Sequence, residues 1–147
     1  MLNQDYKEML SILLGNQVKF LVVGAYAMAS HGYPRATGDI DLWVEATTEN
    51  SMKIYKSLME FGAPGEHYDT STFLEEGIIL QIGVAPRRID IITSIDGINF
   101  NDAWKNKVVA EIGELSIPIL AVDDLIENKL STGRDKDVID AKRLKQA

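Results

Sequence analysis

Three aspartates occupy positions where a buried strand would normally carry apolar residues. Asp39 and Asp41 lie one residue apart in the run R-A-T-G-D-I-D-L-W-V-E, and Asp90 follows an isoleucine in R-R-I-D-I-I. Strand side chains alternate between faces, so Asp39 and Asp41 point to one side, about 7 Å apart, and repel each other. Carboxylates from neighbouring strands can form an all-oxygen site for Mg²⁺. Such sites serve two-metal phosphoryl and nucleotidyl transfer.

The same aspartates also have simple structural interpretations. A D-x-D pattern fits the wet face of an edge strand, because acidic side chains there hinder edge-to-edge pairing. Asp90 could instead form an ion pair with Arg87 or Arg88. The residues alone leave these alternatives open.

The element that precedes D-x-D suggests a phosphate-binding turn. Residues 18–23 form a nearly continuous apolar run, which predicts a central strand covered on both faces. Gly24 interrupts that run, and residues 25–29 predict a short helix. A turn from strand to helix presents backbone N–H groups to phosphate oxygens, so this glycine is a candidate phosphate contact.

The rest of the chain predicts an α/β (α+β) fold with a small, mixed, twisted sheet flanked by helices. No repeat, low-complexity tract or linker interrupts residues 1–147, so we expect a single domain. Apolar spacing, caps and glycines predict further helices over residues 3–14, 99–107, 123–130 and 135–145. Another predicted helix begins at residue 47 or 48 and is ended by the glycines and proline of residues 62–65. The same reading predicts further strands over residues 39–45, 77–84, 87–93 and 117–122.

Composition excludes several classes of protein. The chain has 147 residues, 46% of them hydrophobic, and no cysteine, which rules out disulfides and thiolate zinc sites. The net charge of −7 disfavours unaided binding to a nucleic-acid backbone. The longest apolar run, Phe20 to Ala29, is about half of what spans a bilayer. The N-terminus carries no secretory signal, and we expect a cytoplasmic protein without a membrane partner.

Other common nucleotide and hydrolase motifs are absent from the sequence. It contains no G-x-x-x-x-G-K-[ST], G-x-G-x-x-G, H-E-x-x-H or G-x-S-x-G. A P-loop, a Rossmann fingerprint, a zinc-peptidase helix and a serine-hydrolase elbow are therefore not expected.

The ordered set of motifs resembles the nucleotidyltransferase superfamily, which shares the fold of DNA polymerase β. The family pattern is a Gly-Gly or Gly-Ser turn, a short helix, a D-x-D strand and a third carboxylate on a neighbouring strand. V-V-G-A-Y-A-M-A-S-H-G-Y-P-R-A-T-G-D-I-D-L-W-V matches that order. The runs Q-I-G-V-A-P-R-R-I-D, D-D-L-I-E-N-K and G-R-D-K-D resemble small bacterial members related to AbiEii-type toxins. The resemblance extends over residues 17–145.

The resemblance implies roles for the residues of the D-x-D region. Asp39, Asp41 and Asp90 would be the catalytic carboxylates and the ligands of two Mg²⁺ ions, and Asp90 would also accept the proton of the attacking hydroxyl. Gly24 and Ala25 would face the triphosphate. Ala25 departs from the family pattern, because it stands where a second Gly or Ser is usual and offers only its backbone N–H.

Basic residues elsewhere match positions that neutralise the triphosphate in the family. They are Arg35, Lys129, Arg134 and Lys136. The alternative for residues near helix ends is a solvated side chain matched to the helix dipole.

The expected activity is Mg²⁺-dependent transfer of NMP from an NTP, such as ATP, to a hydroxyl group. The acceptors of such relatives include tRNA ends, the hydroxyl of a partner protein and small molecules, and a toxin–antitoxin role is one alternative. A chain this short leaves little room for a second substrate-binding module, so a homodimer mate or another protein could hold the acceptor. The competing hypothesis is a non-catalytic nucleotide-binding or toxin–antitoxin interaction module that keeps the fold.

Overall fold

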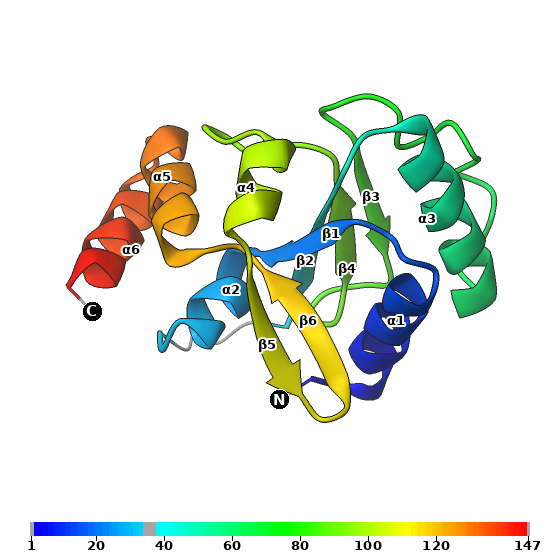
Figure 1. Cartoon of the computed structure of the whole chain (residues 1–147), viewed down its shortest axis with the longest axis horizontal. Coiled ribbons are helices and arrows are strands. Elements are labelled where there is room, and N and C mark those ends of the chain that lie inside the picture. Colours follow the sequence, from blue (N-terminus) through cyan, green and yellow to red (C-terminus); the bar gives the residue numbers. More distant parts are fainter. Residues whose placement is uncertain (1, 34–37, 147) are drawn as a thin grey trace.

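A computed structural model describes residues 2–33 and 38–146 and contains one six-stranded sheet with helices packed around it (Figure 1). The strand order is β3-β4-β2-β1-β6-β5. The strands are β1 (Phe20–Val23), β2 (Ile40–Val44), β3 (Ile79–Ile82), β4 (Ile89–Ile92), β5 (Val108–Ile112) and β6 (Leu115–Ile119). The helices are α1 (Gln4–Gly15), α2 (Gly24–Ser30), α3 (Thr48–Phe61), α4 (Phe100–Asn106), α5 (Val122–Thr132) and α6 (Asp135–Lys145).

The sheet is mixed because hairpins and crossovers both contribute strands. β3–β4 and β5–β6 are antiparallel hairpins, and β1 and β2 are also antiparallel. The parallel pairs are β2 with β4 and β1 with β6. All four residues of β1 are buried, as expected for an apolar strand at the centre of a sheet.

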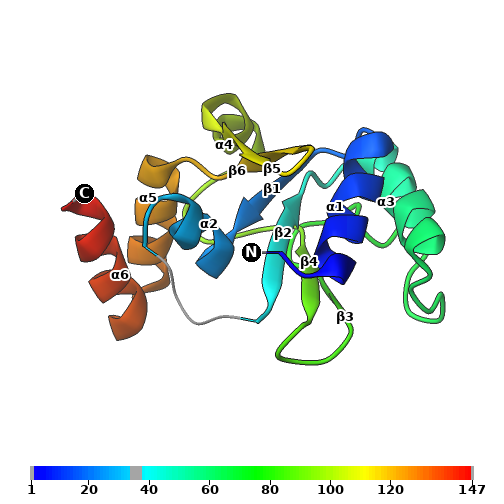
Figure 2. The ribbon, with the colours of Figure 1, turned by 90° about the horizontal axis from the view of Figure 1, so that it is seen from below.

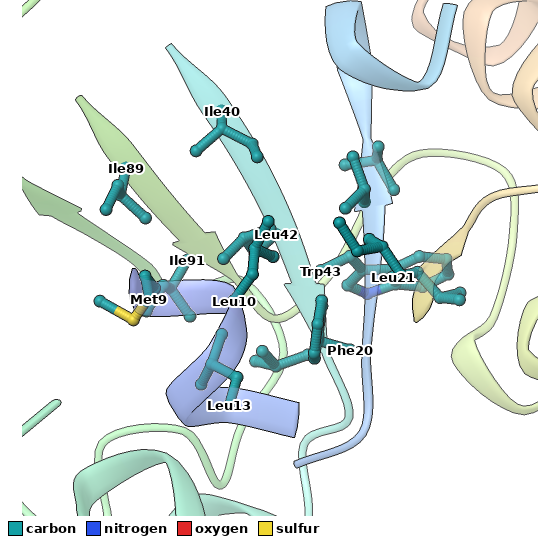
Figure 3. Close-up of a cluster of buried hydrophobic side chains, with 14 of the residues drawn as sticks. Met9, Leu10, Leu13, Phe20, Leu21, Ile40, Leu42, Trp43, Ile89 and Ile91 are labelled. Carbon is teal, nitrogen blue, oxygen red and sulfur yellow. The ribbon is translucent and has the colours of Figure 1, made fainter. Parts of the chain in front are cut away.

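Helices α1 and α3 cover one face of the sheet, and alternation along the strands supplies their apolar partners. Figure 3 shows Met9, Leu10 and Leu13 of α1 facing Leu42 and Ile91 from the sheet. Side chains of the other strand parity point to the opposite face. These two helices lie at one end of the molecule, and α5 and α6 lie at the other (Figure 2).

Short polar side chains begin the helices as the sequence predicts. Asn3, Thr47 and Asn99 each accept a backbone N–H from the first turn of α1, α3 and α4. Gly62 ends α3 in the left-handed conformation, with φ +90°, which glycine adopts without steric cost.

The α/β class, the mixed sheet and all helices of the sequence analysis are confirmed. β5 was missed, and β6 ends at Ile119, earlier than the predicted 122.

The edge-strand interpretation of D-x-D is wrong, because β2 lies between β4 and β1. The strand face that carries Asp41 is not wet along its whole length, because Trp43 on that face is buried and meets Phe100 edge to face at 5.2 Å. No helix in the described part of the chain combines the length and apolarity needed to cross a membrane.

Candidate active site

A row of side chains crosses four strands on the sheet face opposite α1. Strand register pairs Val23 with Asp41, Asp41 with Asp90, and Asp90 with Gln81. Register partners on neighbouring strands point to the same face and lie about 5 Å apart. The sheet therefore places the carboxylates of Asp41 and Asp90 side by side, although 49 positions separate them in the chain.

Gly24 is the residue that lets Asp41 approach the start of α2. Its φ is +67°, and a Cβ atom added there would lie 2.4 Å from Oδ2 of Asp41. Any side chain at this position would therefore strain the backbone and displace the carboxylate. The turn between β1 and α2, where Ala25 follows, consequently lies directly beside the row of acids.

The crowded carboxylates make Asp41 hard to ionise. Burial is the largest cause, followed by the charge and hydrogen bond of Asp90 and by the charge of Asp39; Arg88 opposes them. Together these effects raise the pKa of Asp41 to about 6. A cation placed between these carboxylates would relieve the repulsion.

Arg88 is the counter-ion of the carboxylates of Asp39 and Asp90. Its Nε lies 2.6 Å from Oδ1 of Asp90, and its Nη2 lies 3.1 Å from Oδ2 of Asp90 and 3.3 Å from Oδ2 of Asp39. The backbone N–H of Arg88 also donates to Oδ1 of Asp39 at 3.0 Å. The ion pair considered for Asp90 is therefore formed, with Arg88 as the partner.

The donor chemistry of this cluster suits Mg²⁺, whose preferred ligands are carboxylate oxygens. In the present arrangement, however, the described residues contain no set of three acidic or histidine side chains gathered closely enough to hold a metal ion. The guanidinium of Arg88 takes up oxygens of Asp39 and Asp90 instead. Mg²⁺ would therefore compete with Arg88 for the oxygens of Asp39 and Asp90. The metal-ligand role of Asp39, Asp41 and Asp90 stays a prediction.

A cleft of about 530 Å³ opens over the row of carboxylates. On the sheet side it is lined by Asp41, Asp90, Gly24 and Ala25. On the opposite side it is lined by Lys129, Arg134 and Lys136 from the α5–α6 region. Asp39 does not line this cleft, and Arg35 lies outside the described residues. All the other candidate residues predicted from the sequence meet around one space.

Comparison with known proteins identifies the fold. No protein-family model and no curated protein matches the chain. Among solved structures, a presumed nucleotidyltransferase from Thermotoga maritima matches with a TM-score of 0.67 and 18% identity, over 99% of this chain and 94% of its own. The lincosamide antibiotic adenylyltransferase LnuA, with lincomycin bound, matches with a TM-score of 0.62 and 15% identity, over 99% of this chain and 97% of its own.

The chain has a nucleotidyltransferase fold. The resemblance read from the motifs is thereby confirmed at the level of the fold. Identities of 15% and 18% carry no residue roles, so the chemistry of this nucleotidyltransferase fold must be argued from its own side chains.

The basic side of the cleft is held in place by two acids of α6. The Lys129 side chain is only 13% exposed, and its Nζ lies 3.4 Å from both Asp137 and Asp140. Thr132 Oγ1 donates to Asp137 at 2.7 Å, and Arg134 Nε donates to it at 2.8 Å. Burial opposes ionisation of Asp137, but these partners outweigh it and lower its pKa.

The basic residues of this nucleotidyltransferase fold differ in how well they fit the alternative of a solvated side chain near a helix end. Lys129 does not fit that alternative, because it is largely buried between two carboxylates. Arg134 does fit it in the present arrangement, because its side chain is 75% exposed. To reach a ligand in the cleft, Arg134 would exchange its contact with Asp137 for one with that ligand.

Several residues around the site were not assigned a role from the sequence. Asp137 and Asp140 lie three positions apart on α6, a spacing that places both on one helix face, and this signal could have identified them. Tyr6 of α1 is another such residue, because its hydroxyl lies between the backbone carbonyls of Gly38 and Arg88 and donates to them. Burial, Tyr26 and Asp39 raise the pKa of Tyr6 to about 12, so it stays a donor. It ties α1 to the segments that lead into β2 and β4.

Proposed function

We propose that this protein is a Mg²⁺-dependent nucleotidyltransferase that moves NMP from an NTP to a hydroxyl group. The observation that carries the proposal is the register pairing of Asp41 and Asp90 beside the Gly24 turn, in a cleft whose other side carries three basic side chains next to the acids of α6. A structural role would not call for a second carboxylate beside Asp41 that raises the pKa of Asp41. Carboxylates facing cationic groups across a cleft suit a metal–triphosphate complex.

Each group then has a defined task. Asp39, Asp41 and Asp90 would hold Mg²⁺, which supplies charge neutralisation at the phosphate oxygens when bound. The backbone N–H groups after Gly24 would donate to the terminal phosphates, and Lys129, Arg134 and Lys136 would neutralise their charge. Asp90 would accept the proton of the attacking hydroxyl. Arg88, displaced from Asp90, would keep its contact with Asp39.

The acceptor classes are an RNA end such as that of tRNA, a hydroxyl of a partner protein and a small molecule. LnuA, which has the same fold, is an adenylyltransferase of lincosamide antibiotics, and this supports a small-molecule acceptor. A toxin–antitoxin role would require the protein or RNA acceptor, and a homodimer could contribute part of its binding site. ATP is the donor to test first.

A second candidate function is a nucleotide-binding module without turnover. Two observations favour it: Ala25 stands in the second turn position, and Arg88 neutralises Asp90. Label transfer distinguishes the two candidates. The protein is incubated with α-labelled NTPs, Mg²⁺ and a mixture of RNA, protein and small hydroxyl compounds, and covalent label in any acceptor is measured.

The variant Asp41→Asn tests the role of Asp41 in the same experiment. Glu66→Gln, on an exposed loop, is the control for the loss of one negative charge. If the protein is a nucleotidyltransferase, Asp41→Asn should abolish label transfer and most of the thermal stabilisation by Mg²⁺–NTP. The stabilisation is lost because a ligand stabilises a protein in proportion to how tightly it binds. A binding module predicts stabilisation without transfer. Undiminished stabilisation in Asp41→Asn would refute Asp41 as a metal ligand.

A further inference from the structure

A second row of residues crosses the sheet next to the carboxylates. Strand register pairs Ile79 with Ile92, Ile92 with Trp43, and Trp43 with Leu21. Residues two apart in a strand share a face, so this row lies on the same face as Asp90 and Asp41, about 7 Å along the strands. The second row is apolar on all four strands.

One end of the apolar row is closed and the other is open. Trp43 is buried against Phe100, so the row is part of the core there. At the β3 end, Ile79 is 64% exposed, and it lines the cleft together with Ile92 and Ile95. We call Ile79, Ile92 and Ile95 the isoleucine platform. Ile92 and Ile95 are partly buried beside the exposed Ile79, so the three form one apolar patch on the wall of the cleft, next to the carboxylates.

Charge is distributed unevenly around the cleft. Among the described residues that line it, the basic side chains all come from the α5–α6 region, at Lys129, Arg134 and Lys136. The charged residues nearest the platform along the chain are the acids Asp90 and Asp96. An anionic molecule such as RNA would therefore meet apolar and acidic groups on this side, where the basic side chain of Arg88 is already paired with Asp39 and Asp90.

The strand order separates the platform from the phosphate-binding turn. Gly24 follows β1, and β2 separates β1 from β4, which carries Asp90; β3, with Ile79, lies beyond β4. In an in-line displacement the attacking and leaving oxygens lie on opposite sides of the phosphorus. With the terminal phosphates beside Gly24, the attacking hydroxyl lies toward Asp90 and the body of its molecule lies over β3.

From this arrangement we infer that the acceptor is an uncharged or cationic small molecule whose apolar ring or chain lies on the isoleucine platform. The inference rests on the proposed nucleotidyl transfer. The acceptor hydroxyl oxygen forms a bond to the α-phosphorus, the bond from that phosphorus to the bridging oxygen breaks, pyrophosphate leaves, and the hydroxyl proton passes to Asp90. Gln81, which is exposed and paired with Asp90 in register, is placed to hydrogen-bond a neighbouring polar group.

Matched acceptors test the inference. Methyl and phenyl β-D-glucopyranoside carry the same sugar hydroxyls and differ in one apolar group, and 1-propanol and 3-phenyl-1-propanol form a second pair. The rate constant kcat/KM for label transfer from α-labelled NTP is measured for each compound, for an RNA oligonucleotide with a free 3′ hydroxyl and for a tyrosine peptide. We expect the phenyl member of each pair to be the better acceptor by about tenfold, the effect of burying one ring. Equal rates within both pairs, or a faster reaction of the RNA or the peptide, would overturn the inference while leaving nucleotidyl transfer intact.

Two variants of the β3–β4 hairpin locate the effect. Ile79→Ser is expected to reduce the phenyl preference to about twofold and to leave the affinity for Mg²⁺–NTP unchanged. Val84→Ser is the control, because Val84 is 80% exposed on the same hairpin and does not line the cleft. If Ile79→Ser weakens NTP binding instead, the platform holds the nucleobase and the inference is wrong. If the wild type binds no NTP with Mg²⁺, the proposed function fails, and the acceptor inference fails with it.

Discussion

Asp41 of β2 and Asp90 of β4 are register partners in a parallel strand pair, so their carboxylates share one position on the sheet face. Neither could be moved without shifting its whole strand, because a slip of one residue would turn every side chain to the other face. The proximity of the two acids is therefore a property of the topology.

This proximity predicts an unusual pH dependence of stability. Burial, Asp90 and Asp39 raise the pKa of Asp41 to about 6 from its usual 3.8. An acid whose pKa is higher in the folded chain destabilises the folded state above that pKa, and the cost disappears below the unfolded value. Without divalent ions, Asp41→Asn should be more stable than wild type by about 1–3 kcal/mol at pH 8 and equally stable near pH 3, below the unfolded pKa. Urea unfolding in chelator at both pH values measures the difference, and a variant less stable at pH 8 would contradict it.

Arg88 should compete with Mg²⁺ for the carboxylates. Arg88→Gln removes the counter-ion of Asp39 and Asp90, so the metal-free protein should melt at a lower temperature than wild type. Added Mg²⁺ should restore more stability in Arg88→Gln than in wild type, because no guanidinium has to be displaced. Arg87→Gln, at an exposed neighbouring position, is the control. Thermal melts over a Mg²⁺ titration measure the effect, and a smaller Mg²⁺ response in Arg88→Gln would mean that Arg88 organises the site.

The two basic residues nearest Asp137 should separate stability from binding. Lys129→Met leaves the buried carboxylates of Asp137 and Asp140 without their shared cation and should cost about 3 kcal/mol of stability. Arg134→Ala, at an exposed side chain, should change stability by less than about 1 kcal/mol. Its affinity for Mg²⁺–NTP should fall by about 1–3 kcal/mol if it contacts phosphate. Calorimetry of both variants and of the exposed Lys142→Ala measures this, and unchanged affinity in Arg134→Ala would leave Arg134 a solvated residue.

Gly24 should tolerate no side chain. A Cβ atom would meet Asp41 Oδ2 at 2.4 Å on a backbone with φ +67°, so Gly24→Ala should cost about 1–3 kcal/mol and weaken the stabilisation by Mg²⁺–NTP. Gly15→Ala is a matched control, because nothing lies within 4 Å of a Cβ atom there. Denaturant unfolding of the two variants should differ clearly. Equal stability would mean that Asp41 can move away from the turn without cost.

Local sequence pattern predicted the elements that carry strong signals. The continuous apolar residues identify the central strand β1, apolar spacing identifies α1, and Thr47 identifies the start of α3. β5 lacks such a signal, because Val108, Val109 and Glu111 are exposed and the strand is defined by its pairing with β6.

The contents of the site depended on contacts that no local pattern encodes. Alternation assigns Asp41 and Asp90 to strand faces, but only the sheet order makes them neighbours. The sequence offered Arg87 and Arg88 as partners of Asp90, and the same-face spacing of residues 88 and 90 selects Arg88. Lys129 resembled a solvated residue until its carboxylate partners on the next helix were located.

The division of the cleft between the sheet and the last two helices has a consequence for synthesis on the ribosome. The sheet is complete once β6 reaches Ile119, with the carboxylates of Asp41 and Asp90 already in register. The basic side requires residues 122–145, which emerge later. A nascent chain can therefore assemble its acids before it has the cations that face them, and for that interval the row of carboxylates is open to any ion in the surrounding medium.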